Sequence, residues 1–349
     1  MPALGTSPDI EGRSPHSRVP TICVVNYALV TGVFAIAVAA ASPSAAQRLP
    51  FVRSLDVKEA AALDVSTMRG RIGVRVGPAG RILVRGTVTV RVGFDVPTNA
   101  LDVARKIAGD PPIEHDGNTI RLRPPDDPAE RRAVTVSYEV EVPPDTEVQT
   151  VSDSGATTVS GVTGSVVIRT QSGAVELTGV RSTAAVTSGS GSVAIDGVGG
   201  ALTVTTTSSA ITVRSLQGSA RIRTMSGAVD VEFSGAGGME VETGSSAIRL
   251  RNLRGGLTAT TQSGGVSVEG MPSEAWNVST GSGSVTISTG ASAFTLDATS
   301  GSGQLRVDGA TVQGVVSKRR IAGTIAGGGP HVTVTSRSGS IRVAVTERR

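Results

Sequence analysis

The sequence predicts an all-β protein, a single-chain parallel β-solenoid of about 18-residue rungs with an N-terminal β-rich cap that contains a short helix. Three observations predict this fold. A Ser-Gly pair or a close equivalent returns about every 18 residues, aliphatic and other residues alternate around each pair, and equivalent offsets carry similar side chains in successive repeats. Units of this length cannot bury their own apolar face, so they gain a core by stacking on their neighbours.

The second residue of each pair is taken as the mark of its rung. The marks are Gly155, Gly173, Gly191, Ser209, Gly227, Ser246, Gly264, Gly283, Gly303 and Gly339. Successive marks lie 18 to 20 residues apart, except that the last step is 36 residues, which equals two rungs of 18. Glycine suits these corners because tight turns often need a positive φ, where a Cβ atom is costly.

The pattern that follows each mark predicts one strand. From the second mark onward, the residue two places after the mark is always aliphatic: Val175, Val193, Ile211, Val229, Ile248, Val266, Val285, Leu305 and Ile341. The residue four places after the mark is also aliphatic, while the residue between them is usually polar. A period of two places alternate side chains on opposite faces, so each strand has one inward and one outward face.

A second strand precedes each mark, and from the second mark onward the residues seven and five places before it are apolar. The first of these columns holds Val166, Ala184, Leu202, Ala220, Met239, Leu257, Trp276, Leu296 and Val332. The residue three places before the mark is always Thr or Ser, and we expect these hydroxyls to form a ladder in which each can bond a neighbouring rung. The alternation could also describe an antiparallel meander, but successive strands there would not need identical side chains at identical offsets. An ordinary β-sandwich or a propeller is the alternative fold.

The composition fits a narrow coil better than a wide globular core. The chain has 44 glycines, and aromatic residues make up 2% of it. The formal net charge is +4, and the outward columns mix both signs, which favours a solvated surface over nucleic-acid binding. Cys23 is the single cysteine, so neither an internal disulfide nor a Cys/His zinc site is expected.

Residues 1–46 are predicted to be a signal peptide or, alternatively, an N-terminal membrane anchor. The segment 19–41 carries no formal charge and is rich in Val, Ala, Ile and Leu, and small residues up to Ala46 follow it. This layout predicts cleavage after Ala46, although an apolar stretch of this length could instead span a bilayer. The expected location is therefore extracytoplasmic, in the periplasm, on the cell surface or secreted, with membrane anchoring as the alternative.

Residues 47–147 are predicted to form the N-terminal β-rich cap, and residues 148–346 the solenoid repeats. Within the cap, helical spacing predicts a short helix at Thr98–Ile107, and residues 116–118 predict a hairpin turn. The prolines at 124, 125 and 128 indicate a surface loop, and alternation predicts a long strand at Val134–Val142. Near the other end, Ile321–Gly329 interrupts the Ser-Gly pattern and is expected to be a bulged or capping turn.

No clear catalytic constellation is visible. The best acidic patch joins Asp230 and Glu232 to Glu240 and Glu242 of the next rung, and four arginines at 221, 223, 249 and 251 are expected to neutralise it in place. A serine nucleophile would need a placed base, yet the chain beyond residue 46 offers only two histidines, at 115 and 331. We therefore predict no catalytic, cofactor-binding or metal-binding residues and no cofactor.

The sole tryptophan, Trp276, occupies an inward column, so we expect it to be part of the core rather than a platform for stacking a sugar.

The order of several segments resembles one bacterial family. A strand ends in Val-Pro-Pro at residues 142–144, rungs of the Thr-x-Ser-Gly-x-Val type follow, as at 170–175 and 261–266, and the segment 320–343 closes the chain. Together these features resemble the DUF4097 family of bacterial adhesin-like proteins over about residues 55–345. The resemblance implies an exported β-solenoid and brings no catalytic residues with it.

These observations predict an exported, non-enzymatic β-solenoid of the cell surface or envelope, with an adhesin-like binding role or a structural role. The alternative is a polysaccharide-acting enzyme of the parallel β-helix type, which would need carboxylates clustered on adjacent rungs. The sequence does not identify a partner. An envelope polysaccharide or a surface protein is considered, nucleic acid is not expected, and membrane contact is expected only through residues 19–41 if that segment is retained.

Overall fold

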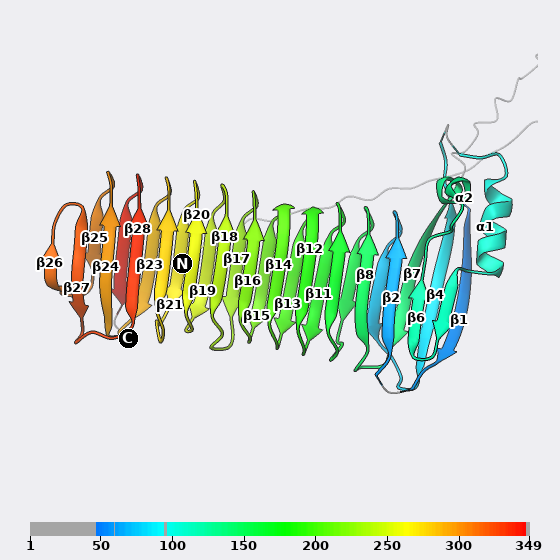
Figure 1. Ribbon diagram of the computed structural model, residues 1–349, viewed down its shortest axis with the longest axis horizontal. Helices are drawn as coiled ribbons and strands as arrows, with labels where there is room; N and C mark the ends of the chain where they lie inside the picture. Colours follow the sequence, from blue (N-terminus) through cyan, green and yellow to red (C-terminus); the bar gives the residue numbers. More distant parts are fainter. Residues whose placement is uncertain (1–46, 59, 94–95, 347–349) are drawn as a thin grey trace, which may run out of the picture. The chain divides into compact units, whose positions relative to one another are not determined.

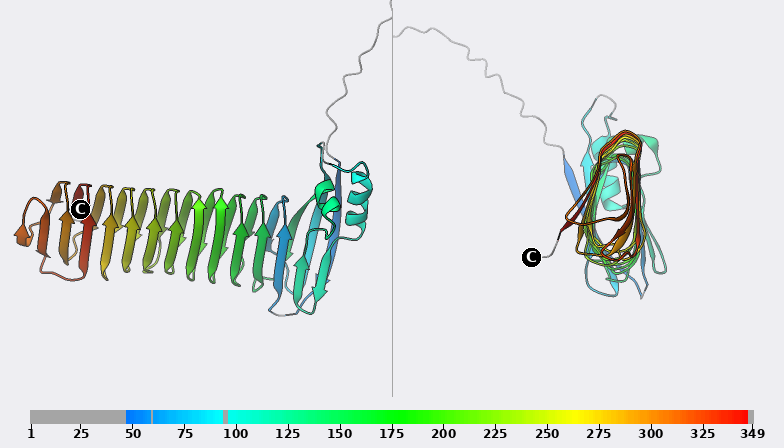
Figure 2. Two further views of the ribbon diagram at one scale, coloured as in Figure 1. Left: turned by 45° about the horizontal axis from the view of Figure 1, so that its top comes forward. Right: turned by 90° about the vertical axis from the view of Figure 1, so that its left-hand side faces the viewer.

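The computed structural model describes residues 47–58, 60–93 and 96–346, which all lie in one compact unit. Two long sheets face each other in this unit, a 14-stranded sheet A and a 15-stranded sheet B (Figure 1). Seen end-on, the rungs superpose as one flattened loop (Figure 2). The predicted signal or anchor segment lies outside the described residues. No helix within the described ranges is long and apolar enough to cross a membrane.

Each regular rung supplies one strand to sheet B and the next strand to sheet A. The sheet B strands are β8 (Glu147–Ser152), β10 (Val166–Thr170), β12 (Ala184–Ser190), β14 (Leu202–Ser208), β16 (Ala220–Thr224), β18 (Met239–Thr243), β20 (Leu257–Thr261) and β22 (Trp276–Thr280). The sheet A strands are β9 (Thr157–Ser160), β11 (Val175–Val180), β13 (Val193–Val198), β15 (Ile211–Leu216), β17 (Val229–Phe233), β19 (Ile248–Leu253), β21 (Val266–Gly270) and β23 (Val285–Gly290).

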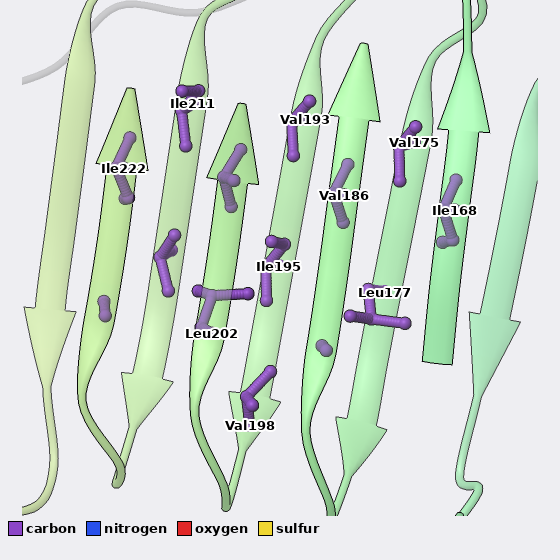
Figure 3. Packing of buried hydrophobic residues seen from close by; sticks show 14 of the residues in the cluster. Ile168, Val175, Leu177, Val186, Val193, Ile195, Val198, Leu202, Ile211 and Ile222 are labelled. Atoms are coloured by element: carbon purple, nitrogen blue, oxygen red, sulfur yellow. The ribbon is translucent and has the colours of Figure 1, made fainter. Parts of the chain in front are cut away.

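Successive rungs pair in parallel and in register, as the columns predicted. Val166 of β10 lies opposite Ala184 of β12, and Val175 of β11 lies opposite Val193 of β13. The aliphatic columns of both sheets point into the thin interior and are buried, except that Leu305 and Val307 of β25 are only partly buried (Figure 3). Trp276 is also fully buried, and its indole Nε1 donates to the Gly255 carbonyl at 2.8 Å. The predicted β-solenoid is thus confirmed, with this tryptophan in its core.

The column of Thr and Ser residues does more than the sequence suggested. Six of these hydroxyls accept a hydrogen bond from the backbone N–H of their own mark, at 2.8 to 3.1 Å, in the pairs Ser152–Gly155, Thr170–Gly173, Thr261–Gly264, Thr280–Gly283, Ser300–Gly303 and Ser336–Gly339. Three of these hydroxyls also donate to a mark carbonyl of the neighbouring rung, as predicted: Thr280 to Gly264, Ser300 to Gly339 and Ser336 to Gly283. One side chain therefore closes its own turn and ties it to the next.

The reason expected for glycine at the marks is wrong for most of them. Only Gly191 and Gly227 among the mark glycines have a positive φ. At the others the carbonyl of the adjacent rung fills the space that a Cβ would take. A Cβ on Gly264 would lie 1.7 Å from the Ser246 oxygen, and one on Gly283 would lie 1.8 Å from the Gly264 oxygen. Close stacking of turns, rather than turn conformation, requires glycine there.

The last rungs do not stack in sequence order. The final strands are β24 (Phe294–Ser300), β25 (Leu305–Asp308), β26 (Gln313–Val316), β27 (Arg320–Ile325), β28 (His331–Ser336) and β29 (Ile341–Thr346). β28 lies between β22 and β24, and β29 lies between β23 and β25. The last rung is therefore inserted beneath the rung that precedes it in the chain.

The spacing of 36 residues before the final mark does not represent two rungs. The extra residues form β26 and β27, and β27 runs antiparallel to β24 at the end of sheet B. The expected capping turn at Ile321–Gly329 is consequently a strand followed by a turn. This segment carries the chain past the end of the coil. The chain then turns back, and its final strands β28 and β29 insert between strands of earlier rungs.

A similar exchange occurs at the N-terminal end. The strands there are β1 (Arg48–Asp56), β2 (Ala62–Thr67), β3 (Ile72–Val76), β4 (Arg81–Val90), β5 (Ile113–Asp116), β6 (Thr119–Leu122) and β7 (Val134–Val142). β2 lies between β8 and β6, and β3 lies between β9 and β7. Both sheets therefore run through residue 147 without interruption, because the region expected to cap the coil also contributes a rung to it.

Two helices accompany these end strands. The predicted short helix is present as α1 (Ala100–Gly109), which buries Ala100, Ala104 and Ile107 and packs against β4 and β1. The proline-rich stretch is not only a loop, because α2 (Pro128–Ala133) begins at Pro128 with Asp127 as its N-cap. An N-cap side chain and a proline in the first turn explain this start. The hairpin around Gly117 and the long strand β7 are as predicted.

Candidate binding surface

The predicted acidic patch is split between opposite sheets. Glu240 and Glu242 lie on β18 of sheet B, whereas Asp230 and Glu232 lie on β17 of sheet A. Consecutive strands along the chain alternate between the two sheets, so acids that follow each other in sequence point away from opposite sides of the coil. They therefore cannot act as one catalytic group.

Arginines on adjacent rungs neutralise the acids on each face, as the sequence predicted. On sheet B, Glu240 of β18 lies 2.6 Å from Arg221 and 3.2 Å from Arg223. Both arginines are on β16, the neighbouring strand in the sheet. On sheet A, Asp230 lies 2.8 Å from Arg251 and 3.7 Å from Arg249 of β19. These ion pairs cross one strand spacing and form two separate charge ladders.

Other carboxylates are also held by arginines. Asp308 lies between Arg306 and Arg342, which together lower its pKa, chiefly through the Arg306 hydrogen bond. Arg85 and Arg75 lower the pKa of Glu141 in the same way. A general acid at neutral pH needs the opposite shift, a raised carboxyl pKa. These two carboxyls are therefore suited to ion pairing rather than to proton donation.

The histidines and possible metal ligands are dispersed. His115 is on β5 at one edge of sheet B, where its Nε2 lies 3.0 Å from the Gly117 carbonyl, and His331 is on β28 near the other end of that sheet. Across residues 47–58, 60–93 and 96–346, no three His, Cys, Asp or Glu residues come together as a metal site.

Sheet B carries an uncharged polar surface near its C-terminal end. Outward side chains on β20, β22, β28 and β24 fall into two columns through the strand register. One column contains Thr258, Asn277, Thr333 and Asp297, and the other contains Thr260, Ser279, Thr335 and Thr299. We call the seven uncharged residues of these columns the hydroxyl face.

The hydroxyl face is exposed and electrically neutral. Its seven side chains are all exposed. The one charge among the two columns, Asp297, is held by the Arg320 guanidinium through two contacts of 3.1 and 3.2 Å. The surface therefore offers hydroxyl and amide groups with no unbalanced charge.

No aromatic ring contributes to this surface. All five aromatic side chains in the described part of the chain are buried: Phe51, Tyr138, Phe233, Trp276 and Phe294. A ligand on the hydroxyl face would accordingly be held by hydrogen bonds rather than by ring stacking.

The sequence contained a signal for this surface that the column analysis did not use. Positions six and four before the mark hold Thr or other small polar residues in the rungs marked by Gly264, Gly283 and Gly339. The sequence could not show that these rungs are consecutive neighbours. β28 reaches its place between β22 and β24 only because the final rung is inserted there.

A groove of about 520 Å³ runs along one corner of the coil. Polar residues line much of it, among them Asn252, Arg254, Glu269 and Ser288. The strand register shifts between Val213 and Leu216 and between Leu250 and Leu253 on this side, so the turns of successive rungs do not align. The groove therefore follows from uneven turn lengths, and its size falls in the range of small-ligand sites.

The comparisons with known proteins concern mainly the coil. The model of the family described as Toastrack DUF4097 matches residues 136–239 and 202–344, which together make up more than half of the chain. No curated protein matches the sequence.

Two solved structures are similar at low identity. One is a candidate adhesin from Bacteroides fragilis NCTC 9343, with 13% identity, coverage of 85% of this chain and 96% of that chain, and a TM-score of 0.31. The other is a candidate cell adhesion protein from Clostridium sporogenes ATCC 15579, with 8% identity, coverage of 85% and 99%, and a TM-score of 0.18. Neither likeness is close enough to transfer a function.

Proposed function

Because the chain belongs to the Toastrack DUF4097 family, a family of β-solenoids, we propose that it is an exported, non-enzymatic protein of the cell envelope or surface that binds a neutral polar polymer. The observation that carries this proposal is the hydroxyl face, on which exposed Thr, Ser and Asn side chains recur on four adjacent strands. The polymer class that suits it is a polysaccharide, whose hydroxyls can both donate and accept hydrogen bonds.

The regular spacing of the face suits a repeating ligand. Adjacent strands of a sheet lie about 4.8 Å apart, so the columns present a polar group at each such step. A hydrogen bond exposed to water contributes only about 0.5–1.5 kcal/mol, so one contact would bind weakly. Many contacts along one chain raise the overall affinity, because each bound unit holds the next close to its site.

The charge ladders support a non-enzymatic role. The acids best placed for catalysis, Glu240 and Asp230, are each bound by two arginines and lie on opposite sheets. Hydrolysis of a glycosidic bond would need two carboxyl groups on either side of one bond, about 5 to 10 Å apart. Export is supported by the charge-free segment 19–41 and the small residues that end at Ala46.

The test is a binding assay with turnover measured in the same samples. The purified protein would be incubated with insoluble cellulose, peptidoglycan and cross-linked dextran, and bound protein and released reducing sugar would both be quantified. We expect saturable binding to at least one neutral polymer without sugar release. Released sugar that disappears in Glu240→Gln would instead establish the enzymatic alternative.

Variants locate the binding surface. Replacing Thr258, Thr260, Thr333 and Thr335 with valine keeps their shape and removes four hydroxyls, and we expect about tenfold weaker binding or more, equivalent to about 1.4 kcal/mol. The matched control is T203V/T205V, which changes two exposed threonines on β14 of the same sheet, beyond the charge ladder. The control is expected to bind normally. Equal binding by both variants would remove the hydroxyl face from the proposal.

A further inference from the structure

The two ends of the coil are protected to different degrees. At the N-terminal end, the edge strand β1 carries Arg48, Pro50 and Arg53, and α1 packs against it. Charged residues, proline and a covering helix are the usual means by which proteins prevent an edge strand from pairing with another chain. At the C-terminal end, sheet B finishes with β26, and none of these features is present on that strand (Figure 1).

β26 is exposed and apolar. Its sequence is Gln-Gly-Val-Val, all four residues are exposed, and the exposed fractions of Val315 and Val316 are 62% and 64%. Val316 lies opposite Ile321 of β27, which is 4% exposed, so both side chains lie on the core-facing side of the sheet. Sheet A ends at β25 and provides no strand opposite β27 and β26, which leaves Val316 uncovered.

The backbone of β26 also has unused hydrogen-bonding groups. In an antiparallel ladder, hydrogen-bonded and non-hydrogen-bonded pairs alternate. The Ser317 N–H donates to the Arg320 carbonyl at 2.8 Å, so this pair is hydrogen-bonded. Alternation then directs the N–H and C=O groups of Val316 and Gly314 away from β27, toward the free edge of the sheet.

A positive charge flanks this edge. Lys318 and Arg319 are exposed in the turn that follows β26, and neither forms an ion pair with another described residue. Arg320, the next residue, is already paired with Asp297. The C-terminal end of the edge strand therefore carries two unpaired positive charges.

From these observations we propose that the free edge of β26 binds an extended segment of another protein, which adds to sheet B as one more strand. The segment would carry apolar side chains at alternate positions and carboxylates at the end that lies beside Lys318 and Arg319. Strand addition of this kind takes its affinity from main-chain hydrogen bonds and its specificity from side chains. A second copy of this chain fits less well. In antiparallel pairing the N-terminal end of its β26 would lie beside Lys318 and Arg319, and that strand, Gln-Gly-Val-Val, has no carboxylate to pair with them.

The test uses the full-length chain and a fluorescein-labelled peptide, Asp-Glu-Val-Thr-Val-Thr, followed by fluorescence anisotropy. In antiparallel pairing, the acidic end of this peptide lies beside Lys318 and Arg319. We expect saturable binding that weakens as salt rises. A peptide with N-methylated valines, which cannot complete the strand ladder, is expected to bind about tenfold more weakly or worse.

Protein variants separate the apolar and charged contributions. We expect V315N/V316N to bind the peptide about tenfold more weakly than the unaltered chain. The control is V52N, which changes a valine that is 55% exposed on β1, the edge strand of sheet A, and it is expected to bind the peptide normally. K318E/R319E should bind a peptide that begins with Lys-Lys more tightly than the acidic peptide. The control R181E, which changes an exposed arginine at a corner in the middle of the coil, should keep its preference for the acidic peptide. Unchanged thermal midpoints establish that the variants are folded.

Three results would overturn the proposal. The first is an absence of saturable binding by the acidic peptide, and the second is equal binding by V315N/V316N and the unaltered chain. The third is a concentration-dependent dimer in sedimentation that V315N/V316N abolishes, because the edge would then be occupied by a second copy.

Discussion

Close stacking of the rungs makes a sharp prediction for Gly264→Ala. The added Cβ would lie 1.7 Å from the Ser246 carbonyl oxygen and 2.4 Å from its carbon, both in the backbone of the adjacent rung. No side-chain rotation can relieve this contact, so the rungs must separate locally. The shift would also weaken the hydrogen bond of 3.1 Å from the Gly264 N–H to the Thr261 hydroxyl.

The expected cost is about 2–4 kcal/mol. Overpacking in a well-packed interior costs about 1–3 kcal/mol, and loss of a hydrogen bond adds about 0.5–1.5 kcal/mol. The neighbouring Gly265 provides a matched control, because a Cβ there would meet nothing closer than the Ser284 oxygen at 3.5 Å, and its φ is not in the left-handed region. Gly265→Ala is expected to change the free energy of unfolding by less than about 1 kcal/mol.

Urea unfolding followed by circular dichroism would measure both variants against the unaltered chain. The free energies of unfolding come from linear extrapolation to zero denaturant. If Gly264→Ala and Gly265→Ala have the same free energy of unfolding, close approach between rungs is not the reason for glycine at the mark.

Two further predictions concern single side chains. Thr170→Val leaves the Gly173 N–H without its 3.0 Å partner and should lower the free energy of unfolding in urea by about 1–3 kcal/mol. The control Thr187→Val, at an exposed position, should lower it by less than about 0.5 kcal/mol. Equal losses would contradict the role of the Thr170 hydroxyl in closing the turn. The pKa of Asp308 is lowered from 3.8 by Arg306 and Arg342, so its stabilising effect is present above that value and is lost as pH falls through the folded-state pKa. Asp308→Asn should therefore lower the thermal midpoint at neutral pH and converge with the unaltered chain in acid, and a difference that stays constant with pH would refute this assignment.

The exchange of rungs at both ends explains where sequence reasoning stopped. Each rung repeats the same inward columns, so the pattern is satisfied whichever rung lies next to which. Val332 fits beside Trp276 as well as beside Leu296, and in the structure it lies between them. The order of the end rungs depends instead on long connections, such as the residues between Asp308 and His331, whose path the periodicity does not specify.

The candidate surface was predictable only in part. Alternation placed Thr258 and Thr260 on an outward face, because a strand must direct every second side chain to the same side. Their continuation into Thr333 and Thr335 through β22 required the inserted final rung. The prediction of a single acidic patch was wrong for a related reason. Asp230 and Glu240 are near each other in the sequence, but they belong to opposite sheets.

The sequence by itself determined the rung, its two strands, its aliphatic interior and its hydroxyl-lined turn, because these depend on residues that recur at fixed offsets from one repeat to the next. Only the tertiary structure decided the order of the rungs at each end, the neighbours of each outward side chain, and the exposed edge at β26. Those features arise from contacts between segments far apart in the chain, and a local repeat carries no information about them.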